Sequence, residues 1–186
     1  MKLILASKSP RRNQLLKDLG YDFIVKNSDY EEKSFTNNPY DTAKTFAEGK
    51  AKSVFNAIDC KADLVVLGSD TVVFLDGEIL GKPKDEIEAR NMLLSLSNKT
   101  HKVISGYAVV TKNGVISGYD ETFVTFNNLS KKVIDDYLNS GLYKGKAGSY
   151  GIQDGYPLVK EYKGSLNNVI GLPTEKLAPI LDKILK

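Results

Sequence analysis

Short apolar runs bounded by polar and turn residues recur along the chain and predict β-strands. Leu3–Ala6 and Leu64–Leu67 are continuously apolar, which is typical of strands covered on both faces. Asp76-Gly77 lies between two further runs, and this dipeptide is a strong hairpin signal. The other expected strands are Val72–Leu75, Glu78–Leu80, Val103–Thr111, Val115–Phe126 and Pro157–Tyr162.

Apolar residues at helical spacing predict helices between these strands. In the first helix, Ser9 suits the N-cap, Pro10 suits the first helical position, and Gly20 suits the C-terminal stop. The other expected helices are Tyr40–Ile58, Glu86–Leu96, Ser130 to about Leu138, and Thr174–Leu185. Because helices and strands interleave while hairpins also occur, the pattern predicts an α/β fold with a mixed sheet.

Composition limits the class of protein. A chain of 186 residues predicts one domain, residues 1–186, with an ordinary 41% of hydrophobic and 26% of charged residues. One cysteine, Cys60, and one histidine, His101, exclude an internal disulfide and any metal site built from several thiolates or imidazoles. The net charge of +3 comes from dispersed basic residues, which argues against dedicated nucleic-acid binding.

Targeting signals and common catalytic motifs are missing from the sequence. No apolar stretch approaches the ~20 residues of a transmembrane helix, and no signal peptide precedes Leu3, so a cytoplasmic location without membrane contact is expected. The sequence also has no P-loop, no G-x-G-x-x-G after a strand and no G-x-S-x-G elbow. No catalytic role is expected for His101 or Cys60. His101 would be structural or face solvent, and Cys60 would be a half-exposed thiol.

Two adjacent arginines occupy an unusual place at the start of the first helix. Arg11 and Arg12 follow Pro10, so they lie where the helix dipole is already positive. Free backbone N–H groups and guanidinium groups would converge there on an anion such as a polyphosphate. The alternative is that both side chains point into water.

A polar tetrad, Gly68-Ser69-Asp70-Thr71, interrupts the apolar run from residue 64 to 75. A carboxylate in such a run is costly unless it is paired or binds a metal, so Asp70 is a candidate functional residue. Alternatively, backbone amides satisfy Asp70 in a structural role. Lys82, on a constrained Gly-Lys-Pro turn, could reach a phosphate. Glu31-Glu32 and the helical Lys50 and Lys52 are equally compatible with a solvated surface.

Taken together, these segments resemble the Maf-type nucleoside triphosphate pyrophosphatases. Seven motifs occur in the family's order over nearly the whole chain, and their order is more specific than any single motif. They are LASKSPRR (residues 5–12), EEK (31–33), GKAK (49–52), GSDTVV (68–73), GKP (81–83), KAGSYGIQ (146–153) and GSLNNVIGLP (164–173).

The resemblance implies an elongated, twisted mixed sheet flanked by helices, with two lobes around a cleft, usually as a homodimer. It implies hydrolysis of a nucleoside triphosphate between the α and β phosphates, which clears unusual or excess nucleotides. Asp70 would be the proton acceptor that activates water, and the other catalytic residues would be Glu32, Lys50 and Lys82. The substrate-binding residues would be Ser7, Ser9, Arg11, Arg12, Thr71 and Gln153.

The resemblance also implies a substrate branch and a divalent metal. Arg12, Thr71 and Gln153 match positions that separate the dTTP/UTP branch from a sister branch that prefers a methylated guanine nucleotide. With one histidine and one cysteine in the chain, oxygen atoms must hold the metal. Asp70 and Glu32 would bind Mg²⁺ or Mn²⁺ together with substrate phosphates.

The sequence departs from the family pattern at two places. Ser69 stands where alanine is expected, and its small side chain should be tolerated. The stretch DGYPLVKEYKG (residues 154–164) lacks the further glycine that the family often has there, which leaves the loop next to Gln153 less certain. Two other functions remain open: a 7-methyl-GTP or inosine-type triphosphate pyrophosphatase, and a non-catalytic nucleotide-binding regulator of cell division.

Overall fold

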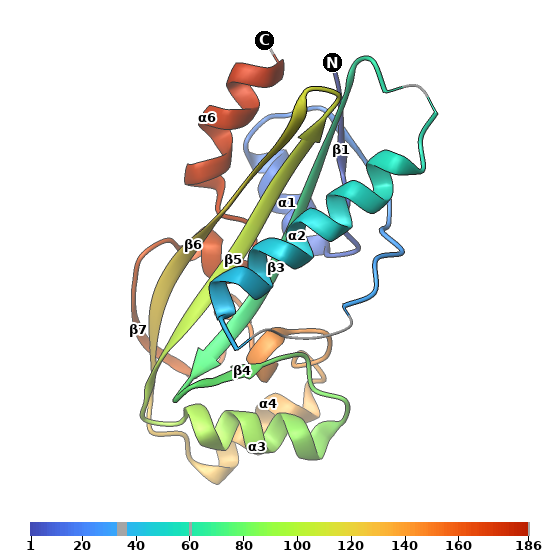
Figure 1. Ribbon diagram of the computed structural model, residues 1–186. Helices are drawn as coiled ribbons and strands as arrows, with labels where there is room; N and C mark the ends of the chain where they lie inside the picture. Colours follow the sequence, from blue (N-terminus) through green and yellow to red (C-terminus); the bar gives the residue numbers. More distant parts are fainter. Residues whose placement is uncertain (33–36, 60, 186) are drawn as a thin grey trace.

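The computed structural model describes residues 1–32, 37–59 and 61–185 (Figure 1). One seven-stranded sheet runs through the molecule in the order β2-β1-β3-β5-β6-β7, with β4 paired to β3. β1 is parallel to β2 and β3, and all other pairings are antiparallel. The strands are β1 (Lys2–Leu5), β2 (Phe23–Val25), β3 (Leu64–Leu75), β4 (Glu78–Leu80), β5 (Thr100–Thr111), β6 (Gly114–Phe126) and β7 (Val159–Lys163).

Helices cover the sheet along much of its length. They are α1 (Pro10–Asp18), α2 (Pro39–Asn56), α3 (Glu86–Leu96), α4 (Lys131–Asn139), α5 (Leu166–Ile170) and α6 (Thr174–Leu185), with one 3₁₀ turn, η1 (Ala147–Ser149). The mixed α/β class and the helix-flanked sheet predicted from the sequence are confirmed. Within the described ranges, no helix has both the length and the hydrophobicity that a bilayer span requires.

Alternation along the central strands sends side chains to two different cores at one end of the sheet. Ile4 and Val66 lie in the core covered by α2, whereas Leu5 and Leu67 lie in the core covered by α1 and α6. A third core forms at the other end of the strands, where α3 and α4 pack against β3, β5 and β6 (Figure 1). The polar tetrad of β3 lies along the strand between these ends.

The interruption predicted at residues 68–71 is wrong, because β3 runs unbroken from Leu64 to Leu75. The tetrad fits a strand because its polar groups find partners within the sheet. Ser69 Oγ donates to the backbone carbonyls of Gly106 and Gly171, at 2.9 and 3.0 Å. Gly68 lies so close to α2 that a Cβ there would come within 2.3 Å of the Ala47 carbonyl oxygen.

Some elements were not predicted. β2 is an edge strand of three residues, and α5 has five residues, so neither carries a clear periodic pattern. β7 begins at Val159 rather than Pro157, and α2 spans Pro39–Asn56 rather than Tyr40–Ile58. The prediction of a half-exposed Cys60 thiol lies outside the described residues.

Candidate active site

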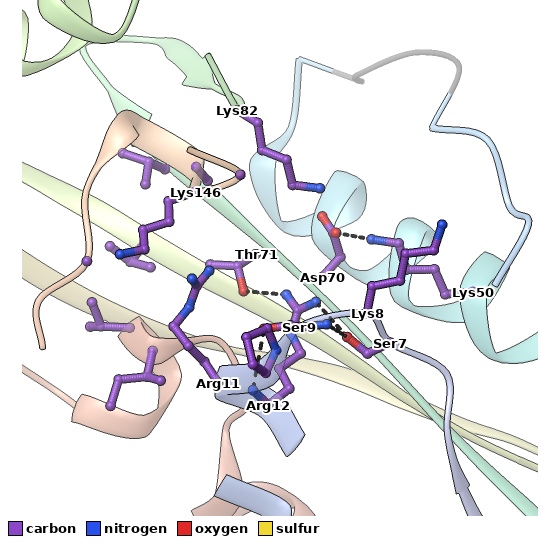
Figure 2. Close-up of a pocket in the computed structure, with 18 of the residues that line it drawn as sticks. Ser7, Lys8, Ser9, Arg11, Arg12, Lys50, Asp70, Thr71, Lys82 and Lys146 are labelled. Atoms are coloured by element: carbon purple, nitrogen blue, oxygen red, sulfur yellow. Dashed lines mark hydrogen bonds and ion pairs between the residues drawn. The ribbon is translucent and has the colours of Figure 1, made fainter. Parts of the chain in front are cut away.

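A cavity of about 520 Å³ opens beside the tetrad of β3 (Figure 2). Its walls come from the β1–α1 turn, β3, the segment after β4, and the loop around η1. The structure brings all ten predicted site residues to this one cavity, although their roles stay predictions. They are Ser7, Ser9, Arg11, Arg12, Glu32, Lys50, Asp70, Thr71, Lys82 and Gln153.

The start of α1 forms one wall, as the sequence predicted. Ser9 is the N-cap, and its Oγ accepts a hydrogen bond from the Arg12 backbone N at 3.4 Å. Ser7 Oγ accepts from the Ser9 backbone N at 3.1 Å. The chain therefore turns sharply after β1 and directs both arginines of the first helical turn to the cavity rather than into open water.

Arg12 is anchored to the protein through its guanidinium group. Its Nε donates to the Gly171 carbonyl at 2.7 Å, and Nη2 donates to Thr71 Oγ1 at 3.0 Å. A long contact of 3.5 Å joins Nη1 to Ser7 Oγ. Burial lowers the pKa of Arg12, while the charge of Asp70 opposes that shift. The guanidinium remains cationic at neutral pH, so it is a fixed positive charge beside the cavity.

Thr71 is held in turn by a buried polar network behind the cavity. Thr71 Oγ1 and Ser105 Oγ lie 2.8 Å apart, and Ser105 Oγ donates to the Asn168 carbonyl at 2.8 Å. The Asn168 side chain donates to the Val103 carbonyl and to Thr122 Oγ1, both at 3.0 Å. This network fastens α5 to the sheet and fixes the positions that hold Arg12.

A cluster of one ammonium and two carboxylates forms the catalytic candidate, and we call Lys50, Asp70 and Glu32 the shared-lysine cluster. Lys50 Nζ contacts Asp70 Oδ1 and lies 2.7 Å from Glu32 Oε1. Lys82 Nζ lies 3.8 Å from the same Glu32 oxygen. Burial raises the pKa of Glu32, but its hydrogen bond to Lys50 and the nearby cations outweigh this and hold that pKa below its usual value.

The shared-lysine cluster has the oxygen chemistry that a hard divalent cation requires. Asp70 is buried, with 7% of its side chain exposed, whereas Glu32 is 30% exposed toward the cavity. Within the described ranges, no group of three or more Asp, Glu, His and Cys residues is arranged to hold a metal. Two carboxylates can nevertheless bind Mg²⁺ when substrate phosphates and water supply the remaining oxygens.

A second lysine–carboxylate cluster lies across the cavity, and sequence reasoning did not identify it. We call Lys146, Asp154 and Tyr137 the closed cluster. Lys146 Nζ contacts Asp154 Oδ2, and the Tyr137 hydroxyl donates to the same oxygen at 2.7 Å. Only 8% of the Lys146 side chain and 6% of the Asp154 side chain are exposed. Burial lowers the pKa of Lys146 and raises that of Tyr137.

The closed cluster supports the loop that carries Gln153. The Tyr137 hydroxyl accepts a hydrogen bond from the Gly151 backbone N at 3.1 Å, and the Asp154 backbone N donates to the Gly151 carbonyl. A Cβ at Gly151 would come within 2.6 Å of Asp154 Oδ2, so only glycine fits. In Figure 2, Lys146 and Arg11 lie on the opposite side of Arg12 from Lys50.

His101 lies behind the cavity, in agreement with a structural role. Its Nε2 lies 2.7 Å from the hydroxyl of Tyr150, a residue of the cavity wall. Burial lowers the pKa of His101 to about 4, so the ring is neutral at neutral pH. Lys8 and Lys144 also line the cavity. Sequence reasoning assigned no role to either, although Lys8 lies within the motif LASKSPRR.

Comparison with known proteins places the chain in a family. A protein family described as Maf-like protein matches residues 2–184. The chain belongs to this family. The resemblance stated from the seven motifs is thereby confirmed.

Full-length relatives of this Maf-like protein carry a name that states their substrates. A dTTP/UTP pyrophosphatase of Clostridium acetobutylicum is 45% identical over 192 residues, which cover 97% of this chain and 96% of that protein. A dTTP/UTP pyrophosphatase of Thermosipho africanus is 47% identical over 182 residues, covering 97% and 92% of the two chains. Among solved structures, a HAM1 protein from Coxiella burnetii aligns with a TM-score of 0.56 at 16% identity, over 98% of this chain and 99% of that one, and so supports the fold.

Proposed function

We propose that this Maf-like protein hydrolyses dTTP and UTP to the nucleoside monophosphate and pyrophosphate, and so clears unusual or excess nucleotides. The names of its full-length relatives support this reaction. The observation that carries it is the arrangement of cations around one buried carboxylate, Asp70 (Figure 2). Arg12 comes from α1, Lys50 from α2 and Lys82 from the loop after β4.

The charges of the cavity suit a triphosphate. A triphosphate carries about four negative charges at neutral pH, and cleavage adds charge to the leaving pyrophosphate. Arg11, Arg12, Lys50 and Lys82 offset this charge and orient the α phosphorus for in-line attack. The N-cap turn with Ser7 and Ser9 brings the start of α1, the positive end of its helix dipole, to the same end of the cavity.

Asp70 would act as the general base for the attacking water. Lys50 donates a hydrogen bond to Asp70 Oδ1, and a carboxylate held in this way can take up the proton of an attacking water. Glu32 competes for the same ammonium at 2.7 Å, so Lys50 does not neutralise both carboxylates. Lys50 alone therefore does not balance the two carboxylates, and Lys82 and Arg12 lie close to them.

A divalent cation, Mg²⁺ or Mn²⁺, would be held by Asp70 and Glu32. When bound, it would supply additional positive charge to the phosphate oxygens. The hard oxygen donors of the two carboxylates support this choice over zinc. Lys82, 3.8 Å from Glu32, can adjust its position because 53% of its side chain is exposed.

The nucleobase would be recognised by Gln153, which lines the cavity wall formed by the loop after η1. Gln153 offers an amide with both a donor and an acceptor, which can match the N3–H and carbonyl groups of thymine or uracil. Thr71, next to Asp70 in the chain, would hold the substrate near Asp70, the proposed general base. Cytosine and the purines present different edges, so they should react more slowly.

The assembly and location follow the family expectation. We propose that residues 1–186 act as one functional domain, that two copies form a homodimer, and that the enzyme works in the cytoplasm, where its nucleotide substrates are made. The single sheet that continues from β2 to β7 supports the one-domain interpretation.

One substrate panel tests the proposed reaction. Pyrophosphate release is measured with dTTP, UTP, CTP, dGTP, 7-methyl-GTP and ITP, and kcat/KM should be highest for dTTP and UTP. A preference for 7-methyl-GTP or ITP would assign the chain to another branch while retaining the chemistry. Absence of turnover on every triphosphate would instead support a nucleotide-binding regulator.

A further inference from the structure

Asp154 makes a contact that bears on how the proposed site reads its base. Its Oδ2 is used by Lys146 and Tyr137, and its Oδ1 accepts a hydrogen bond from Gln153 Nε2 at 3.2 Å. The carboxylate therefore contacts both the buried cation of the closed cluster and the exposed amide at the cavity wall. Neither Asp154 nor Tyr137 is among the site residues predicted from the sequence.

The contact fixes the direction of the Gln153 amide. A carboxylate only accepts hydrogen bonds, so the end of the amide that faces Asp154 must be its NH₂ group. The opposite direction would bring the amide oxygen against a carboxylate oxygen. Because Asp154 is itself held by Lys146 and Tyr137 and is 6% exposed, it cannot rotate away to accommodate a reversed amide.

A fixed amide distinguishes bases that a rotating amide would accept equally. Uracil and thymine present a donor at N3 between two carbonyl acceptors, which suits the Gln153 oxygen beside its second N–H. Cytosine presents an acceptor at N3 and an amino donor at position 4. To pair with cytosine, the amide would have to reverse, and the Asp154 contact opposes this reversal.

We propose that Asp154 is a specificity-determining positioning residue, which orders the Gln153 amide so that the site accepts uracil and thymine and rejects cytosine. This inference rests on the proposed function, because it needs a pyrimidine base at Gln153. Asp154 contacts the amide that would read the base and is not among the residues that line the cavity. Its substitution should therefore change the choice between bases more than the rate on the preferred base.

The test is a double-mutant cycle on the ratio of kcat/KM for UTP to that for CTP. Asp154→Asn keeps the size of the side chain but can both donate and accept, so the Gln153 amide can take either direction. The ratio should fall roughly tenfold, as expected when one well-formed hydrogen bond no longer discriminates. In a Gln153→Ala background, the same substitution should leave the ratio unchanged, because the amide through which it acts is gone.

A matched control uses the same substitution at another ion-paired aspartate. Asp135 on α4 pairs with Arg90 at 2.6 Å and with Lys131 at 2.5 Å, and it does not line the cavity. Asp135→Asn should not change the ratio. Thermal unfolding of each variant shows whether it is folded, and calorimetric affinities for UMP and CMP provide a second readout that does not need turnover.

The outcomes separate this inference from the proposed function. An unchanged UTP-to-CTP ratio in Asp154→Asn, or an equal fall in the Gln153→Ala background, would overturn the role of Asp154 while wild-type turnover still supports the pyrophosphatase. Unchanged UMP and CMP affinities in a folded but inactive Asp154→Asn would overturn it as well. If the wild type releases no pyrophosphate from any triphosphate, the proposed function fails first, and the inference fails with it.

Discussion

The shared-lysine cluster and the closed cluster lie on opposite sides of the cavity. Both combine a lysine ammonium with carboxylates, but in different proportions and with different exposure. In the first, one ammonium lies between two carboxylates, one of them 30% exposed. In the second, one carboxylate takes both an ammonium and a tyrosine hydroxyl, and the pair is less than 10% exposed. Counted over its own three groups, the first carries one net negative charge, which would attract a divalent cation, whereas the second is balanced and supports a loop.

The difference shows that pairing alone does not identify a catalytic residue. A buried lysine–carboxylate pair can be structural or catalytic, and we use the number of charged groups and their exposure to distinguish the two roles. The following predictions test this contrast in turn, beginning with the largest effect.

Removal of divalent metal should affect the shared-lysine cluster alone. Hydrolysis should stop in excess chelator and return on addition of Mg²⁺ or Mn²⁺, because the unbalanced carboxylates and the substrate phosphates need a cation. Pyrophosphate release with and without chelator measures this effect, and the melting temperature should stay the same. Full activity in chelator would contradict this prediction and show that Lys50 and Lys82 supply enough positive charge for hydrolysis without a metal.

Asparagine substitutions at the two buried aspartates should have unequal effects on rate. Asp70→Asn should lower kcat by ~10²–10⁴-fold, because an amide cannot accept the proton of the attacking water. Asp154→Asn should lower kcat for UTP by less than about tenfold, since its carboxylate does not meet the reacting atoms. Steady-state kinetics on folded protein tests both predictions. If Asp70→Asn kept a few tenths of wild-type turnover, another residue would be the general base, and Glu32 would be the next candidate.

Methionine substitutions at the two lysines should have unequal effects on stability. Lys146→Met leaves Asp154 buried without its cation and should cost about 3–5 kcal/mol of unfolding free energy. Lys50→Met should be partly rescued by Mg²⁺, because a divalent ion can take the place between Asp70 and Glu32, whereas Mg²⁺ should not rescue Lys146→Met. Denaturant unfolding with and without Mg²⁺ measures this. Equal rescue of both variants would contradict the contrast between the clusters.

Removal of a single hydroxyl from the closed cluster should have the smallest effect. Tyr137→Phe deprives Asp154 of a donor and the Gly151 N–H of an acceptor, which should cost about 1–3 kcal/mol. Tyr156 packs its ring against Tyr137 at 5.0 Å, and within the described chain its hydroxyl makes no hydrogen bond, so Tyr156→Phe is the matched control. Equal stability of the two variants would mean that the hydroxyl of Tyr137 contributes nothing.

The sequence predicts the site better than it predicts the local structure around it. Asp70 stands out because it interrupts an apolar run, and Arg11 and Arg12 stand out because they oppose a helix dipole. Both signals are local. The interruption at residues 68–71, however, proved to be continuous strand, since Ser69 and Thr71 find partners on β5 and near α5 that no local pattern reveals.

The closed cluster could not be predicted for the same reason. Asp154 precedes a glycine, which is typical of a turn, and its partners Lys146 and Tyr137 lie 8 and 17 residues earlier in the chain. Only the fold of the loop over α4 brings them together. Elements such as β2 likewise depend on pairing with β1 rather than on their own three residues.

The anchoring of Arg12 has a consequence for the order in which the protein becomes active. Its guanidinium joins Thr71 in the middle of the chain to Gly171 near its end. A ribosome delivers the α1 arginines and Asp70 long before Gly171, so a nascent or stalled chain holds the reactive groups without the carbonyl that fixes Arg12. A chain whose synthesis has not passed α5 therefore lacks the shorter of the two hydrogen bonds that anchor Arg12.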